Sequence, residues 1–229
     1  MQQDFQVLQS TGSDATRNSV LRNTYRLLGL SMLPTAVGAM LGVNSSFAFL
    51  AASPIMGTLL MMAGIYGLMF AIERNKYSAT GVYLLLALTF LLGFMLGPIL
   101  QVSLHMRSGG QLVGLAAAGT GLTFLGMSAF GSNVNRDFNR IGNFLSAGAI
   151  VLLVCMVAQI FLRLPMFQLV IAGGFMIFSS LMISYQINQI VRGGETNYIS
   201  ATLTLYISIY NIFVSLLQIL MAFSGNDRD

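Results

Sequence analysis

Long apolar runs separated by short polar gaps dominate the hydrophobic pattern of this sequence. A hydrocarbon layer of about 30 Å requires an apolar helix of roughly 17–25 residues, and runs of this kind follow one another along the chain. The expected spans are Leu27–Val43, Pro54–Ile72, Ala79–Gln101, Gln111–Gly131, Ile141–Leu162, Phe167–Ile190 and Tyr198–Phe223. Spanning strands would instead show segments of about ten residues with alternating polarity. We therefore predict an all-α membrane protein with a bundle of seven transmembrane helices.

The composition agrees with a membrane protein. The chain has 229 residues, of which 55% are hydrophobic and only 8% are charged, too apolar a mixture for a soluble domain of this length. Residues 1–26 are polar, and we expect a disordered or weakly helical tail there. The predicted organisation is this N-terminal tail, a transmembrane domain over residues 27–223, and a short C-terminal tail over residues 224–229.

The positive charges predict the orientation. If seven spans alternate, one side of the membrane receives eight basic residues: Arg17, Arg22, Arg26, Arg74, Lys76, Arg136, Arg140 and Arg192. The other side receives three: Arg107, Arg163 and Arg228. Basic residues accumulate on the cytoplasmic side. We expect a cytoplasmic N-terminus and a C-terminus on the outer side, and this use of Lys and Arg accounts for the high pI without nucleic acid as a partner.

The four prolines divide into two kinds. Pro54 and Pro165 stand at the expected starts of spans, where a missing N–H group has no cost. Pro34 and Pro98 fall inside spans, so each should kink its helix and leave a carbonyl that a neighbour or water must satisfy.

Glycines recur inside the spans at spacings that let helix backbones approach closely, which predicts compact packing. They are Gly38, Gly42, Gly93, Gly97, Gly110, Gly114, Gly119 and Gly121.

The chemistry of the common catalytic and metal sites is missing. Every charged residue falls in a tail, a loop or the end of a span, whereas proton relays and ion pumps need ionisable groups at mid-membrane depth. His105 is the one histidine, without a second ligand for a metal. Gly126-Met127-Ser128-Ala129-Phe130 lacks the last glycine of a serine nucleophile turn, and no base accompanies it. We expect no enzyme activity, no metal and no cofactor.

A polar stripe runs along the last span. Thr204, Ser208, Asn211, Ser215 and Gln218 recur at steps of four, three, four and three. At about 100° per residue they occupy an arc of roughly 80°. Such a face should point away from lipid, either to bond other helices or to line an aqueous path or a substrate groove. Gln186, near the end of the sixth span, is a candidate neighbour of this stripe because the connecting loop is short.

Several strings resemble the Bax inhibitor-1 family over essentially all seven spans. They are Leu21–Tyr25, Leu96–Leu100, Tyr185-Gln186-Ile187-Asn188-Gln189-Ile190 and Leu205–Phe213. The runs Gly193–Ile199 and Tyr210–Leu217 look specifically like the bacterial YccA-like branch of the family. The resemblance implies a seven-helix fold in which the last helix is central and the other six surround it.

Some members of that family are thought to be pH-gated calcium or proton leaks, controlled by two aspartates that share protons across the last two helices. The matching positions here are Gln186 and Ser208. Neither side chain ionises, so a carboxylate pair cannot form at these positions, and this gating device is not expected.

Resemblance to the YccA-like branch implies instead an inner-membrane protein that binds the ATP-dependent membrane protease FtsH and restrains its degradation of other membrane proteins. This is our leading hypothesis. The alternative is a cation leak, without the aspartate pair, along Thr204, Ser208, Asn211 and Ser215. The expected partners are an FtsH-type protease and the lipid bilayer, and the sequence does not set the oligomeric state.

Overall fold

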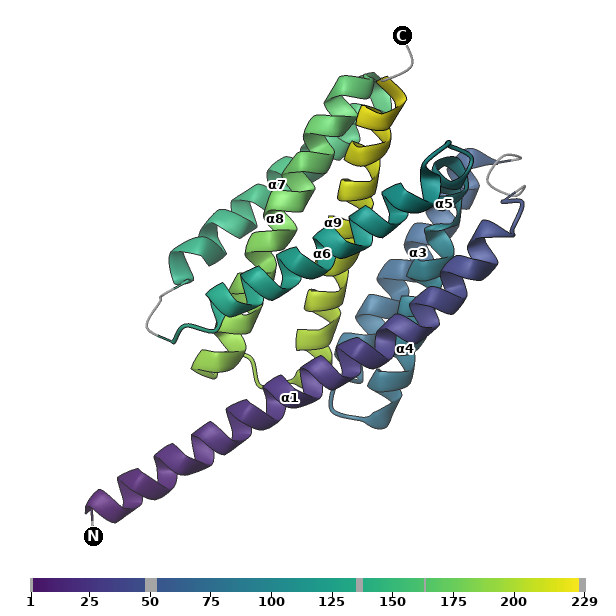
Figure 1. Cartoon of the computed structure of the whole chain (residues 1–229). Helices are drawn as coiled ribbons and strands as arrows, with labels where there is room; N and C mark the ends of the chain where they lie inside the picture. Colours follow the sequence, from purple (N-terminus) through teal and green to yellow (C-terminus); the bar gives the residue numbers. More distant parts are fainter. Residues whose placement is uncertain (1, 48–52, 135–137, 163, 227–229) are drawn as a thin grey trace. The chain divides into compact units, whose positions relative to one another are not determined.

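This computed structural model describes residues 2–47, 53–134, 138–162 and 164–226, which form helices and turns with no strand (Figure 1). The helices are α1 (Gln2–Val43), α3 (Pro54–Arg74), α4 (Ala79–Met95), α5 (Gly97–Leu104), α6 (Gly109–Gly131), α7 (Asn139–Leu162), α8 (Pro165–Arg192) and α9 (Tyr198–Asn226). The prediction of an all-helical chain is confirmed.

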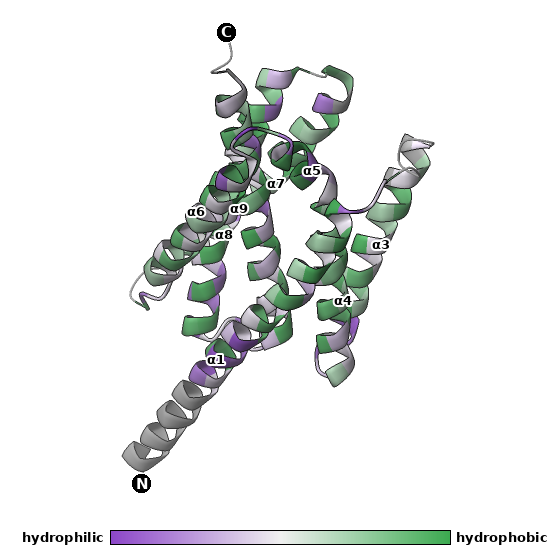
Figure 2. Ribbon diagram, turned by 45° about the vertical axis from the view of Figure 1, so that its right-hand side comes forward, coloured by the Kyte–Doolittle hydropathy of each residue, from purple (hydrophilic) through white to green (hydrophobic). Residues whose placement is uncertain are grey.

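Six of the described segments are long and apolar enough to cross a membrane, with α4 and α5 together forming one of them, Ala79–Leu104. The remaining expected span, Pro54–Ile72, coincides with helix α3. Hydrophobic residues predominate along these helices (Figure 2). The chain is therefore a multi-pass membrane protein, and each expected span coincides with helix.

The N-terminal segment differs from the simplest expectation. Helix α1 begins at Gln2 and continues to Val43, so the polar residues 2–26 belong to the same helix as the first span. At the other end, α9 continues past Phe223 to Asn226. The division into a tail, a transmembrane domain and a second tail stays a prediction.

The two internal prolines have different effects. The helix of the third span is interrupted at Leu96, and Pro98 stands in the first turn of α5, where its missing N–H needs no partner. Pro34 lies inside α1, which continues through it to Val43. Pro54 and Pro165 occupy the first turns of α3 and α8, as expected.

The described chain falls into two compact units. Unit 1 contains residues 1–21, 107–196 and 204–229, and unit 2 contains residues 22–106 and 197–203.

In unit 2, glycines let α1 approach α4 and α5 at backbone distance. A Cβ atom added at Gly38 would lie 2.9 Å from the Phe94 nitrogen, and one added at Gly97 would lie 2.6 Å from the Gly42 carbonyl carbon. A Cβ at Gly93 would meet the Thr35 backbone at 2.8 Å. The compact packing predicted from Gly38, Gly42, Gly93 and Gly97 is confirmed.

In unit 1, helix α8 packs against both α6 and α7. Of the other expected glycines, only Gly119 has a neighbour near its missing Cβ, the Leu216 side chain at 3.1 Å. Nothing lies within 4 Å at Gly110, Gly114 or Gly121, so the expectation of close packing is wrong at these three positions.

Candidate functional site

Helix α9 carries all five residues of the polar stripe, and they belong to unit 1. Ser208 and Ser215 are buried, with 3% and 5% of their surface exposed. Thr204, Asn211 and Gln218 are half-buried. The Ser208 hydroxyl donates to the Thr204 carbonyl oxygen at 2.8 Å, one turn earlier in the same helix. Ser208 thus makes the bond to a carbonyl of the preceding turn that hydroxyls in transmembrane helices often make.

Burial on α9 is not limited to the stripe. Leu205, Ile212 and Leu217 are fully buried on other sides of the helix, and no residue from Tyr198 to Ala222 is exposed. In the candidate span of α9, 33% of the residues in the most apolar window are buried, against 6% in that of α7. The side chains of α9 are thus more buried than those of α7.

The sixth predicted site residue, Gln186, lies on α8 and is buried, with 7% of its surface exposed. It belongs to the same unit as the stripe. Among the hydrogen bonds of the described residues, none joins Gln186 to Thr204, Ser208, Asn211, Ser215 or Gln218. The structure therefore does not connect the two parts of the predicted site by a direct polar contact.

The polar contacts of α8 run instead to the end of α6. The Ser184 hydroxyl donates to the Met127 carbonyl at 2.8 Å, and the Asn188 amide donates to the carbonyls of Gly131 and Asn133, each at 3.2 Å. Ser184 and Asn188 are buried and stand one helical turn apart. Gly131 has no side chain, and the backbone of Ser184 occupies the space beside it. These contacts fix the C-terminal turn of α6 on α8.

Asn188 stands in one of the strings that resemble the family, but the resemblance does not predict this contact. The signal available was the four-residue spacing of Ser184 and Asn188, which puts both on one helix face. The acceptors are backbone carbonyls, and their position depends on how α6 ends. Residue types do not reveal such acceptors.

The buried polar set contains no ionisable carboxylate, amine or imidazole. Its members in the described chain are Thr24, Ser31, Thr89, Ser103, Thr120, Ser128, Ser179, Ser184, Gln186, Asn188, Asn197, Ser200, Thr202, Ser208 and Ser215. No group of three His, Cys, Asp or Glu residues that might hold a metal occurs in the part that the structure describes. Ser128 and Ser179, on α6 and α8, each have a buried hydroxyl oxygen without a hydrogen-bond partner. The chemistry of this interior is that of neutral hydrogen-bonding groups.

These features define a class: a multi-pass helical membrane protein with an uncharged polar interior. A family model described as "Inhibitor of apoptosis-promoting Bax1" matches residues 17–225. The chain belongs to this Bax inhibitor-1 family.

Two groups of relatives illustrate the range of similarity. An uncharacterised protein of Neisseria meningitidis serogroup A is 47% identical over 229 residues, covering 99% of this chain and 100% of the relative. A protein of Escherichia coli K12 named "Modulator of FtsH protease YccA" is 42% identical over 210 residues, 92% of each chain. Its counterpart in Escherichia coli O6:H1, named "Inner membrane protein YccA", has the same identity and coverage. The resemblance seen in the sequence is confirmed.

Proposed function

We propose that this chain is a non-enzymatic inner-membrane protein that binds an FtsH-type ATP-dependent protease and inhibits its action on other membrane proteins. One observation carries the proposal: the 42% identity, over 92% of both chains, to the Escherichia coli protein named as a modulator of that protease. Identity at this level over nearly the full length favours a shared partner.

The polar interior supports a role through protein contact. Ser184, Asn188 and Ser208 all direct their side-chain donors to backbone carbonyls. The bonds of Ser184 and Asn188 hold α8 on the end of α6, and the bond of Ser208 stays within α9. Because Gln186 and Ser208 carry no charge, two groups at these positions cannot share a proton in response to pH.

We also propose that α9 is the central helix of a seven-span bundle with a cytoplasmic N-terminus. The absence of exposed residues from Tyr198 to Ala222 supports the central position. A helix facing lipid would show an exposed apolar stripe, as α7 does at Ile150, Val154 and Phe161. In this arrangement the stripe residues and Gln186 are interior residues with no catalytic role.

Co-purification tests the pairing. The tagged full-length chain is extracted in mild detergent from cells that contain a proteolytically inactive FtsH, so that captured partners persist. We expect FtsH in the eluate well above the amount recovered with an unrelated multi-span protein carrying the same tag. A degradation assay with a second membrane substrate should then show slower loss of that substrate when the chain is present. Recovery at background level would refute the proposal.

The cation leak remains the competing function because Thr204, Asn211 and Gln218 are only half-buried and lie on one face of α9. Flux into vesicles containing the purified chain separates the two. A modulator conducts nothing, and Asn211→Leu leaves both flux and FtsH capture unchanged. Cation flux that falls in Asn211→Leu would favour the leak.

A further inference from the structure

Within unit 2, helix α1 has two opposite faces. Taking about 100° per residue, Thr24, Ser31, Gly38 and Gly42 lie on one face, and the structure buries all four. The opposite face, within an arc of roughly 80°, is exposed throughout. Its members are Arg22, Arg26, Gly29, Leu33, Val37 and Met40.

The exposed face changes character along its length. Arg22 and Arg26 are four residues apart and therefore adjacent on the helix surface. Beyond them the face is apolar, with Leu33 65%, Val37 52% and Met40 70% exposed. Figure 2 shows this change from hydrophilic to hydrophobic colour along α1. Nothing lies within 4 Å of a Cβ built at Gly29, so the space between the arginines and Leu33 is open.

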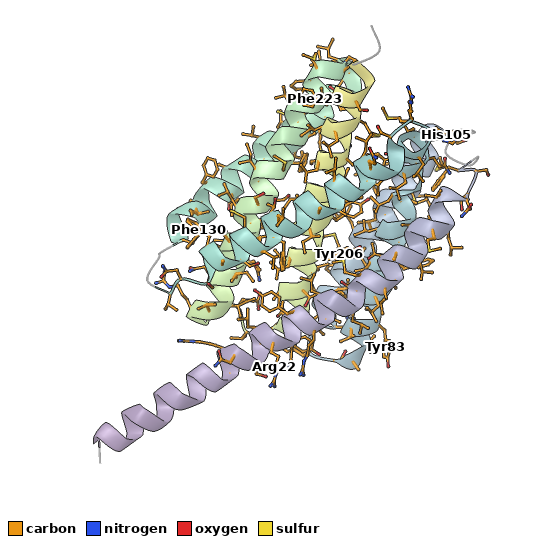
Figure 3. The ribbon with its side chains drawn as sticks, viewed as in Figure 1. Arg22, Tyr83, His105, Phe130, Tyr206 and Phe223 are labelled. Carbon is orange, nitrogen blue, oxygen red and sulfur yellow. The ribbon has the colours of Figure 1, made fainter. Side chains whose placement is uncertain are left out.

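Charge in unit 2 is confined to one end. The charged residues of its sequence are Arg22, Arg26, Glu73, Arg74 and Lys76. The one carboxylate, Glu73, pairs with Lys76 at 3.0 Å. Figure 3 shows Arg22 and Tyr83 at one end of the unit and His105 at the other. The two guanidinium groups on α1 thus lack a carboxylate from their own unit, because its single acidic residue is already engaged.

We propose that this face of α1, the Arg22–Met40 face, binds one anionic phospholipid, with its phosphate on Arg22 and Arg26 and an acyl chain along Gly29, Leu33 and Val37. Guanidinium groups bind phosphate through paired N–H donors. Arg26 and Val37 are eleven residues apart, about 16 Å at 1.5 Å per residue, which matches half of a hydrocarbon layer of about 30 Å. A phospholipid combines the required anion and hydrocarbon in one molecule, whereas free phosphate and a soluble acidic protein leave the apolar part uncovered.

The absence of tryptophan from this sequence allows a site-specific test. Leu33→Trp places a single fluorophore on the Arg22–Met40 face. The purified full-length variant is reconstituted in vesicles of phosphatidylcholine with increasing fractions of brominated phosphatidylglycerol or, separately, brominated phosphatidylcholine, because bromine quenches tryptophan on contact. We expect phosphatidylglycerol to be preferred roughly thirtyfold, since the two arginines contribute about 1 kcal/mol each near a membrane surface and about 1.4 kcal/mol is tenfold. The preference should fall as salt rises.

Matched variants locate the effect. In the Leu33→Trp background, Arg22→Gln with Arg26→Gln should reduce the preference to near one, while Arg22→Lys with Arg26→Lys should retain most of it. Arg74→Gln, an exposed arginine of the same unit outside this face, should change nothing. Leu122 lies on α6 and is 71% exposed. A tryptophan in its place, Leu122→Trp, should report no preference for phosphatidylglycerol.

Three results would overturn the proposal. The first is equal quenching of Leu33→Trp by the two lipids, and the second is a preference that survives the double glutamine variant. The third is quenching by neither lipid, which would mean that protein covers this face. The salt series and the lysine variant keep the test decisive if the glutamine variant does not fold. None of these readouts depends on FtsH.

Discussion

Single amide side chains hold the ends of helices in this protein. Gln101 donates to the carbonyls of Val43 and Ser45 at 2.8 Å each, where α1 ends. Asn188 does the same for the end of α6, and Asn197 donates to the Lys76 carbonyl at 2.8 Å. The last carbonyls of a helix have no partner within it, so a side-chain amide from a neighbouring segment can supply the missing donor. These amides therefore connect the ends of helices to other parts of the chain.

Replacing Asn188 tests this idea. Asn188→Ala removes the donor for Gly131 and Asn133 in a buried site, and we expect a loss of roughly 1–2 kcal/mol in stability, near the upper range for polar contacts between membrane helices. Thermal unfolding in detergent should show a lower Tm. Ser180→Ala is the control, because that hydroxyl donates to Met176 within its own helix and should matter little. Equal Tm values for the two variants would contradict the assigned role.

Pairs of helices depend on where glycine stands. Gly38 and Gly93 face the backbones of α4 and α1, respectively, so the two helices meet without side chains between them. Gly67, on α3, has nothing within 4 Å of its missing Cβ. Glycine is thus required for close helix packing at Gly38 but not at Gly67.

Gly38→Ala and Gly67→Ala should consequently change stability in opposite directions. A methyl group at Gly38 collides with backbone atoms of Phe90 and Phe94 that cannot rotate away, so α1 must shift, at a cost of about 1–3 kcal/mol. Gly67→Ala meets no atom and should gain up to about 1 kcal/mol from better helix propensity. Guanidinium or thermal unfolding in one detergent compares them directly. A loss of stability in both variants would count against the close approach.

The apolar runs were sufficient to predict the helices, because length and hydropathy are set by the membrane rather than by neighbours. Phe167–Ile190 was expected and Pro165–Arg192 is found. The contacts between helices are harder to predict from the sequence. Pro98 coincides with a break at Leu96 while Pro34 lies in continuous helix, although the sequence predicts a kink at both. The stripe on α9 was evident from spacing, but its relation to Gln186 and the bonds of Ser184 depend on backbone positions in other helices.

The expected seven-span topology distributes the basic residues unevenly between the two sides of the membrane, which predicts the direction of insertion. Alkaline phosphatase, active only outside the cytoplasm, should be active when fused after Asp229, while a green fluorescent protein fused there should be dark. Fusions at Asn75 and at Ser108 should give, respectively, the cytoplasmic and the external result. A fluorescent C-terminal fusion would require an even number of spans and remove the proposed orientation.

The amide of Asn197 has two separate tasks. Its oxygen accepts the N–H groups of Ile199 and Ser200 at 2.9 and 3.1 Å, starting α9, while its nitrogen holds the turn between α3 and α4. Spontaneous deamidation of Asn197 to Asp would keep the hydrogen bonds from the Ile199 and Ser200 N–H groups. It would abolish the bond to the Lys76 carbonyl, since a carboxylate accepts but does not donate. In hydrogen exchange, Asn197→Asp should leave the Ile199 and Ser200 amides protected and expose the Ser78 amide, whereas Asn197→Ala should expose all three. Deamidation of Asn197 would thus release the turn between α3 and α4 while the start of α9 stays helical.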